Sequence, residues 1–499
     1  MSLGVRWLGS ILAIGLAIGV AASPNHVLGE DSPGISLAVP SLAVPVPVSF
    51  QVGSLAVPVP VGSSQCSLAV PVQFGSPTGL RGLRCLSRLV SRLVPVPVGV
   101  LDWEHQSGDG YSGDPVRALH KYLQRPFQER PPMSEQSFFR APLTKTQARE
   151  VRSLLVADHR AWILRSRSEE MGARVVSHGD FEMPFWYKVY GEPNEQGRSL
   201  YLSLHGGGGA PRKVNDRQWE NQKRLYTPAE GVYLAPRAPT DTWNLWHQEH
   251  IDPLFDRLIE NLIVFEKVDS DRVYLMGYSA GGDGVFQLAP RMADRFAAAS
   301  MMAGHPNETS PRGLRNLPFS LHVGSEDRAY RRNELGREWQ KKLAVLRAAD
   351  PEGYVHWAKI YQGKGHWMDR EDAAAVEWMA KFTRNRFPEK IVWRQDDVVH
   401  TRFYWLTVPV GQGRAGSELI VRREGQVFVI EKAQVEQLGL LLNDEFVDLD
   451  RPIQVWLGNR EVFSGKVDRT IESLHRTLVE RGDPKMVFSA GIEIELHAD

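Results

Sequence analysis

The chain of 499 residues contains only two cysteines, Cys66 and Cys85. Two cysteines can form at most one disulfide bond, so the sequence excludes a small scaffold held together by several disulfides. Neither cysteine has the neighbours expected of a thiol nucleophile or of a cysteine-based metal site. We therefore expect the folded domains to be stabilised by an ordinary hydrophobic core.

An excess of charge of one sign is also missing. Lysine and arginine together number 59, and aspartate and glutamate together also number 59. No basic cluster with interleaved aromatic residues occurs, which is the pattern typical of nucleic-acid binding. The composition predicts a soluble globular protein with no nucleic-acid partner.

Long hydrophobic runs are absent except near the start of the chain. Arg6 precedes the apolar residues 7–20, and the small residues 21–23 follow. This apolar stretch is short for a membrane span and has the layout of a secretory signal peptide, which we assign to residues 1–22. The alternative is an uncleaved anchor. We expect a secreted or periplasmic protein with no membrane span after signal cleavage.

Residues 23–100 have a low-complexity composition. The sequence SLAVPVPV of residues 41–48 recurs after thirteen residues at Ser54 and, shortened, at Ser67. Proline at this density blocks helices and central strands. We interpret the tract as a disordered, non-catalytic linker, because its repeat units are too short to form the packed layers of a solenoid.

The most informative motif is a glycine-rich turn after an apolar run. Residues 272–276 read RVYLM, as expected of a buried parallel strand, and residues 277–282 follow with GYSAGG. The pattern G-x-S-x-G after a strand is typical of a nucleophile elbow, in which a sharp turn exposes a serine hydroxyl above the sheet edge. Ser279 is the predicted nucleophile.

A second glycine cluster lies upstream. Residues 199–204 alternate as a strand does and lead directly into His205 and the four glycines 206–209. Amides without bulky side chains can approach a developing oxyanion closely. The alternative is a flexible loop, but two glycine-rich strand ends in this order favour an oxyanion-binding segment.

From about residue 173 to residue 386 the chain resembles the α/β-hydrolase superfamily, because it has the HGGG-type segment upstream of G-x-S-x-G-G. The double glycine resembles polyhydroxybutyrate depolymerases and feruloyl esterases, and also serine peptidases of the prolyl oligopeptidase type. The resemblance implies a doubly wound, mostly parallel sheet and a catalytic triad in the order serine, acid, histidine. It implies no cofactor.

The triad order can be compared with the strands expected after Ser279, which are residues 296–302, 318–323 and 354–361. The family places its acid after the second of these strands and its histidine after the third. Asp327 and His366 occupy these two positions. Glu326 is the competing acid, and we prefer Asp327 because it fits the family pattern G-x-x-D. His366 is the expected general base, and Asp327 is expected to orient it.

Further site residues follow from the same resemblance. The expected oxyanion donors are the amide of Ala280 and that of Gly207 or Gly208. Trp243 and Trp246 follow the predicted strand 231–235, so they either wall the substrate pocket or pack in the core.

Three histidines are further candidates for a substrate contact or a metal site. His305 follows a strand end and is a candidate substrate contact. His247 and His250 lie three residues apart without a third ligand, so we predict no metal site.

Five segments are expected in all: residues 1–22, 23–100, 101–171, 172–389 and 390–499. The third is expected to be a helical accessory element against the hydrolase core, and the fourth is the catalytic domain. The fifth contains short alternating strands and a hairpin signal at Gly458 and Asn459, as in a small all-β, sandwich-like domain. It either stabilises the protein or binds a polymer or a cell surface.

These patterns predict a secreted serine hydrolase that cleaves a small-molecule or polymeric carboxylic ester through an acyl-enzyme. One alternative is a peptidase of the prolyl oligopeptidase type that uses the same triad. The segment before residue 172 is too short for the propeller of that family, which favours the esterase. Another alternative is an inactive hydrolase fold that serves in binding or adhesion. The sequence leaves the oligomeric state open.

Overall fold

The computed structural model describes residues 112–496. All the described residues belong to one compact unit. The predicted signal peptide, the repeat linker and both cysteines lie outside the described residues. None of the helices in residues 112–496 combines the length and the apolar composition needed to cross a bilayer.

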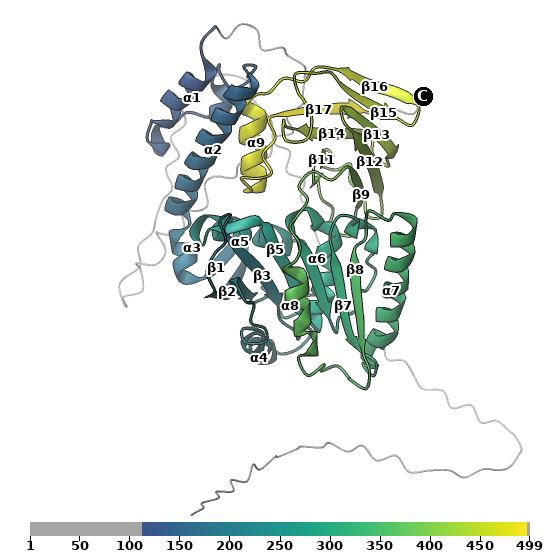
Figure 1. The fold of residues 1–499 in the computed structure, drawn as a ribbon. Coiled ribbons are helices and arrows are strands. Elements are labelled where there is room, and N and C mark those ends of the chain that lie inside the picture. Colours follow the sequence, from purple (N-terminus) through teal and green to yellow (C-terminus); the bar gives the residue numbers. More distant parts are fainter. Residues whose placement is uncertain (1–111, 497–499) are drawn as a thin grey trace, which may run out of the picture. The chain divides into compact units, whose positions relative to one another are not determined.

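An eight-stranded sheet forms the centre of the fold, in the order β1-β2-β4-β3-β5-β6-β7-β8 (Figure 1). Strands β1 and β2 are antiparallel to their neighbours, and β3 to β8 pair in parallel. The expected mostly parallel α/β sheet is therefore confirmed. The strands are β1 (Val175–His178), β2 (Phe181–Tyr190), β3 (Arg198–Leu204), β4 (Gly231–Pro236), β5 (Val268–Tyr278), β6 (Ala298–Met302), β7 (Phe319–Gly324) and β8 (His356–Tyr361).

Helices cover both faces of this sheet, because successive strand residues point to opposite sides. Leu202 of β3 belongs to the core that α5, α6 and α7 cover, whereas Tyr201 packs in the core on the α8 side. Leu225, just beyond α4, joins the Tyr201 side. The sheet is therefore doubly wound, as expected. The helices are α4 (Arg212–Gln222), α5 (Ile251–Phe265), α6 (Ala280–Arg291), α7 (Arg332–Ala349) and α8 (Ala374–Met379).

Three helices precede the sheet: α1 (Pro115–Leu123), α2 (Lys145–Ser166) and α3 (Ser168–Ala173). Thr144 and Gln147 cap the start of α2 reciprocally. Val151 and Leu155 of α2 pack with Leu474 of α9 (Ile471–Arg481), and Figure 1 shows the two helices side by side. The helical segment was expected to pack on the hydrolase core, but its apolar side chains are mainly buried against this helix of the C-terminal part.

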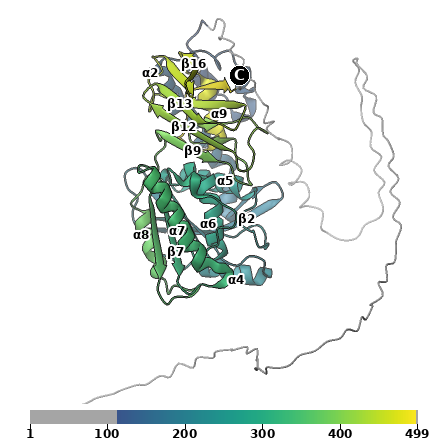
Figure 2. The same cartoon turned by 90° about the vertical axis from the view of Figure 1, so that its right-hand side faces the viewer.

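The C-terminal part contains two small sheets, as a sandwich-like module should (Figure 2). Its hairpin between β15 and β16 lies at Gly458 and Asn459 as expected. Helix α9 differs from the all-β expectation, and β13 pairs with β15 in parallel. One sheet has β16 (Arg460–Gly465), β15 (Ile453–Leu457), β13 (Val427–Lys432), β12 (Glu418–Glu424) and β9 (Lys390–Arg394); the other has β10 (Arg402–Phe403), β11 (Leu406–Thr407), β14 (Gln437–Leu442) and β17 (Ala490–Glu495).

A buried ion network joins the C-terminal part to the central sheet. Arg384, whose side chain is 1% exposed, contacts Asp271 of β5 at 2.8 Å and Asp483, just after α9, at 2.7 Å. Burial alone would raise the pKa of Asp483, but Arg384 and Arg295 hold it well below its ordinary value. A buried charge is costly unless its partner is present, so each member of this network depends on the others.

We predict that Arg384→Met destabilises the protein by about 3–5 kcal/mol, because it leaves two buried carboxylates without their cation. Chemical denaturation would measure this loss. Arg328→Gln is the control, since the Arg328–Glu326 pair is exposed and such pairs contribute about 0–1 kcal/mol. Equal stabilities of the two variants would contradict the prediction.

Candidate active site

Ser279 lies between the end of β5 and the start of α6, with φ of 59° and ψ of −123°. A non-glycine residue adopts this region only where its surroundings impose it. The glycines of the motif explain how the turn is packed. A Cβ atom on Gly277 would collide with the carbonyl oxygen of Gly281, and one on Gly281 would collide with that of Leu204. The motif therefore encodes a turn in which backbone lies directly against backbone.

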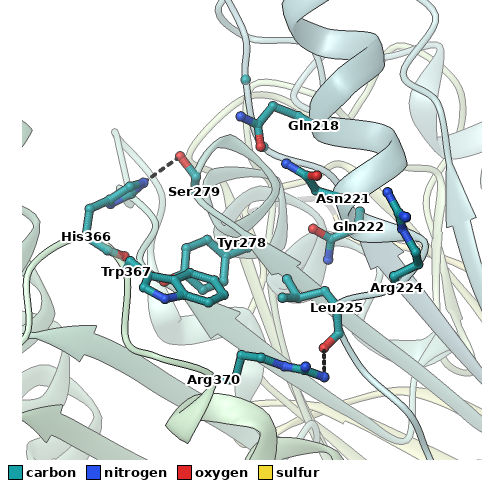
Figure 3. A pocket seen from close by; sticks show the side chains of 12 residues that line it. Gln218, Asn221, Gln222, Arg224, Leu225, Tyr278, Ser279, His366, Trp367 and Arg370 are labelled. Atoms are coloured by element: carbon teal, nitrogen blue, oxygen red, sulfur yellow. Dashed lines mark hydrogen bonds between the residues drawn. The ribbon is translucent and has the colours of Figure 1, made fainter. Parts of the chain in front are cut away.

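The serine hydroxyl contacts the predicted histidine (Figure 3). His366 Nε2 lies 2.9 Å from Ser279 Oγ, and His366 Nδ1 lies 2.8 Å from Asp327 Oδ2. The Asp327 side chain is 1% exposed, whereas that of His366 is 43% exposed. The buried carboxylate accepts the Nδ1–H bond, so Nε2 is left as an acceptor facing the hydroxyl. The structure thus brings all three predicted residues together.

Glu326, the competing acid, points elsewhere. Its Oε2 pairs with Arg328 Nη2 at 2.7 Å, and its side chain is 48% exposed. The contact to His366 comes from Asp327, as the G-x-x-D pattern indicates.

Tyr278 holds the loop that carries the histidine. Its hydroxyl donates to the His366 carbonyl oxygen at 2.6 Å and accepts from the Met368 N–H at 3.1 Å. Sequence reasoning missed this residue, because the second position of G-x-S-x-G is variable and carries no motif of its own.

The glycine-rich loop after β3 is fixed by His205. Its Nε2 accepts the N–H of Ala238 at 3.1 Å, so its Nδ1–H donates to the Gly206 carbonyl oxygen at 2.6 Å. Burial lowers the pKa of His205 to about 4, which keeps the ring neutral near pH 7. In a trans peptide the carbonyl and the following N–H point in opposite directions. Anchoring the Gly206 carbonyl therefore sets the direction of the Gly207 N–H.

Only part of the expected oxyanion set is available. The Gly208 N–H donates to Asn215 Oδ1 at 2.8 Å, so this amide is already satisfied. For the amides of Gly207 and Ala280, residues 112–496 provide no acceptor. A Cβ on Gly207 would also collide with Asn215, and Gly207 has φ of +108°. Of the two glycine alternatives, Gly207 is the one with a free donor.

Trp243, Trp246 and His305, the expected substrate contacts, do not line the cavity beside Ser279 and His366. Trp246 is completely buried and donates its Nε1–H to the His205 carbonyl oxygen at 3.0 Å, so it packs beneath the oxyanion loop. Trp243 is 65% exposed and lies against Gly209. His305 bonds through its ring to Asn307. Of the two readings for Trp246, burial in the core is the one observed.

A cavity of about 610 Å³ lies beside Ser279 and His366 (Figure 3). Its volume is in the range typical of small-molecule sites. Much of its wall comes from α4 and the turn after it, a segment whose polar sequence carries no motif and which we did not predict. The remaining lining residues are Gly206, Gly207, Gln218, Asn221, Gln222, Arg224, Leu225, Tyr278, Trp367 and Arg370.

Within residues 112–496, His247 and His250 belong to no close group of three potential metal ligands. Burial lowers the pKa of His247 to about 4 and also lowers that of His250. In residues 112–496 the one close group of three potential metal ligands consists of the carboxylates of Glu308, Asp396 and Asp397.

The central sheet, the elbow and the order of the three contacting residues together define the fold. The chain has the α/β-hydrolase fold. No family model matches the sequence. The chain is 31% identical over 145 residues to "Putative esterase NocK" of Nocardia uniformis subsp. tsuyamanensis, an alignment that covers 26% of this chain and 41% of that protein. It thus spans about two fifths of the length of this curated relative.

Solved structures of esterases are also similar, at low identity. A thermostable esterase is 19% identical with a TM-score of 0.34, covering 42% of this chain and 64% of that one. The LpqC poly(3-hydroxybutyrate) depolymerase of Bordetella parapertussis is 16% identical with a TM-score of 0.30, covering 43% and 92%. An acetyl xylan esterase of Aspergillus awamori is 14% identical with a TM-score of 0.29, covering 41% and 97%.

Asp283, in the first turn of α6, is a half-buried carboxyl that interacts with His366. Burial raises its pKa from 3.8 to about 6, although the His305 N–H, Arg332 and His366 favour the charged form. Its Oδ1 accepts the His305 N–H at 2.6 Å. Because the folded-state pKa is above the unfolded one, this carboxyl stabilises the fold fully below pH 3.8, and the contribution is lost as the pH rises through about 6.

We predict that Asp283→Asn removes this pH dependence while keeping an acceptor for the His305 amide. Between pH 4 and pH 6.5 the wild type should lose up to about 3 kcal/mol of unfolding free energy relative to the variant. Urea unfolding of both proteins across this range would test it, since other carboxyls cancel in the difference. If the unfolding free energies of the two proteins changed with pH in parallel, Asp283 would not titrate as described.

Proposed function

We propose that this protein is a serine hydrolase that cleaves carboxylic esters through a covalent acyl-enzyme. The observation that carries the proposal is the continuous contact from Asp327 through His366 to Ser279 beside a cavity. The free amides of Gly207 and Ala280 support it, because an acyl-transfer site needs donors for a developing oxyanion.

Acylation begins when His366 Nε2 removes the proton from Ser279 Oγ, which attacks the ester carbonyl carbon. The carbonyl oxygen becomes negatively charged, and the N–H groups of Gly207 and Ala280 stabilise it. Collapse of this intermediate breaks the bond to the alcohol oxygen, which takes its proton from His366. The carboxylate of Asp327 keeps the imidazole in the required tautomer and stabilises its transient positive charge.

Deacylation repeats the same steps with water. His366 removes a proton from a water molecule that attacks the acyl-serine, and the same amides receive the second oxyanion. Ser279 regains its proton from His366 as the carboxylic acid leaves. The serine turn and the donors keep their positions throughout, which is the basis of electrostatic stabilisation by a preorganised site.

We propose ester cleavage rather than peptide cleavage on two grounds. The curated relative is named as an esterase, and residues 115–173, which precede the sheet, form helices rather than propeller blades. A peptidase with the same triad is the second candidate, and a preference for peptide amides over aryl esters would favour it. An inactive binding protein is the third.

Export and domain division are also proposals. We infer from residues 1–22 that the protein is secreted or periplasmic, and the N-terminal residue of the mature protein would test this. We propose residues 172–389 as the catalytic domain and residues 390–499 as a stabilising module. The contact of Arg384 with Asp483 supports a stabilising role.

We predict that a fluorophosphonate labels the wild type and not Ser279→Ala, because only an activated serine attacks this reagent. Ser279→Ala and His366→Ala should each lower kcat on an aryl ester by about a thousandfold or more. Mass spectrometry and steady-state kinetics provide the measurements. Ser166→Ala, at an exposed helix position, is the control. A wild type that resists labelling would favour the inactive binding protein.

We predict that the two neighbouring acids differ strongly in their effect. Asp327→Asn should lower kcat by about a thousandfold or more, because the imidazole loses the partner that fixes its tautomer. Glu326→Gln should cost less than about tenfold, since Glu326 pairs with exposed Arg328. Kinetics on one aryl ester decide between them, and a larger loss for Glu326→Gln would reverse our assignment of the acid.

A further inference from the structure

The cavity beside Ser279 carries positive charge without any negative charge. Arg224 and Arg370 are its cationic lining residues, and none of the residues that line it is an aspartate or a glutamate. Both arginines are exposed to solvent, so they lie where the cavity opens to water, and charge of one sign there attracts an oppositely charged molecule.

Neither guanidinium forms an ion pair with a carboxylate in the described part of the chain. Within residues 112–496, Arg224 and Arg370 have no carboxylate at ion-pair distance, whereas Arg237, Arg315 and many others do. Arg370 Nη2 donates to the Leu225 carbonyl oxygen at 2.9 Å, and Arg224 Nε donates to that of Glu220 at 3.4 Å. These backbone contacts orient the two side chains and leave their charges uncompensated.

Asp372 is a buried acid that interacts electrostatically with Arg370. Asp372 accepts a hydrogen bond from Tyr226, and burial raises the pKa of this carboxyl above its ordinary value. The Asp372 carboxylate interacts with Arg370 at longer range, but its hydrogen bond is with Tyr226. Both guanidinium groups therefore remain available to a bound anion.

The cavity connects these cations to the nucleophile. In Figure 3 Ser279 and His366 lie together, with Arg224 and Arg370 away from them. Gln218 and Asn221 of α4 add amide groups to the wall, and they lie three residues apart on one helix face. A substrate with its ester bond at the serine would thus extend toward the arginines.

We propose that the substrate is an ester that carries an anionic oxygen group, a carboxylate or a phosphate, away from the scissile bond, and that Arg224 and Arg370 bind this group. The inference rests on the proposed ester hydrolysis and names its substrate class. The fork of N–H donors on a guanidinium fits both kinds of oxyanion. Hydrolysis adds water across the ester bond and leaves the anionic group unchanged.

The test compares matched esters that differ in this one charge. On the acyl side the pair is para-nitrophenyl hemiglutarate and para-nitrophenyl pentanoate. On the alcohol side it is the acetate of para-hydroxyphenylpropanoate and para-propylphenyl acetate. The readout is the ratio of kcat/KM, anionic to neutral, which does not depend on the amount of active enzyme.

In the wild type the anionic ester of at least one pair should be preferred. Arg224→Gln and Arg370→Gln should each lower that ratio about tenfold or more, as expected when a hydrogen-bonded charge contact is lost. Added salt should lower it as well. Arg217→Gln is the matched control, because this exposed arginine of α4 is not among the cavity residues. Its ratio should equal that of the wild type.

Competition separates the two anion sources. Glutarate should inhibit hydrolysis of the neutral ester if the site takes carboxylates, and inorganic phosphate should do so if it takes phosphates. Ser279-dependent hydrolysis with no anionic preference and no effect of either substitution would overturn the inference alone. Failure to hydrolyse any of the four esters, with no fluorophosphonate labelling, would instead overturn the proposed function.

Discussion

The contact of backbone against backbone around Ser279 is the constraint on which the rest of the site depends. Gly281 packs on the carbonyl of Leu204 at the end of β3, and the Ser279 N–H donates to the Met302 carbonyl oxygen of β6 at 2.9 Å. Three parallel strands therefore meet the turn directly, and the unusual φ of Ser279 is imposed from several sides. The same closeness brings Gly206 against the serine, so the glycine-rich loop that carries the proposed oxyanion donors packs directly on the proposed nucleophile.

The parts of the site that lie outside regular structure are held by polar side chains. His205 anchors the peptide before Gly207, Asn215 occupies the amide of Gly208, and Tyr278 binds two backbone groups around His366. Each makes hydrogen bonds that a loop cannot make with itself, and two of them are completely buried. Buried polar contacts of this kind specify one loop conformation, because any other would leave a donor or an acceptor unsatisfied.

What the sequence predicted well were features written locally beside a strand. Ser279, Asp327 and His366 each follow a predicted strand and a nearby glycine, so strand periodicity and turn chemistry locate them. The order of the strands follows from the same periodicity. Which of two adjacent glycine amides is free could not be read in the same way, because Asn215, from another element, decides it. The burial of Trp246 and the cavity wall from α4 are likewise tertiary facts. Helix α9 did have local signals, since Thr470 caps its start and Gly482 ends it with a positive φ. We did not predict this helix because the surrounding sequence has the pattern of short strands.

The packing of α2 on α9 has a consequence for synthesis on the ribosome. Arg140, just before α2, bonds Glu472 of α9, and these residues are 332 positions apart in the chain. The apolar side of α2 emerges early together with α1, but its contact with α9 cannot form until almost the whole polypeptide has been made. During translation this part of the core is therefore completed only when α9 has been made.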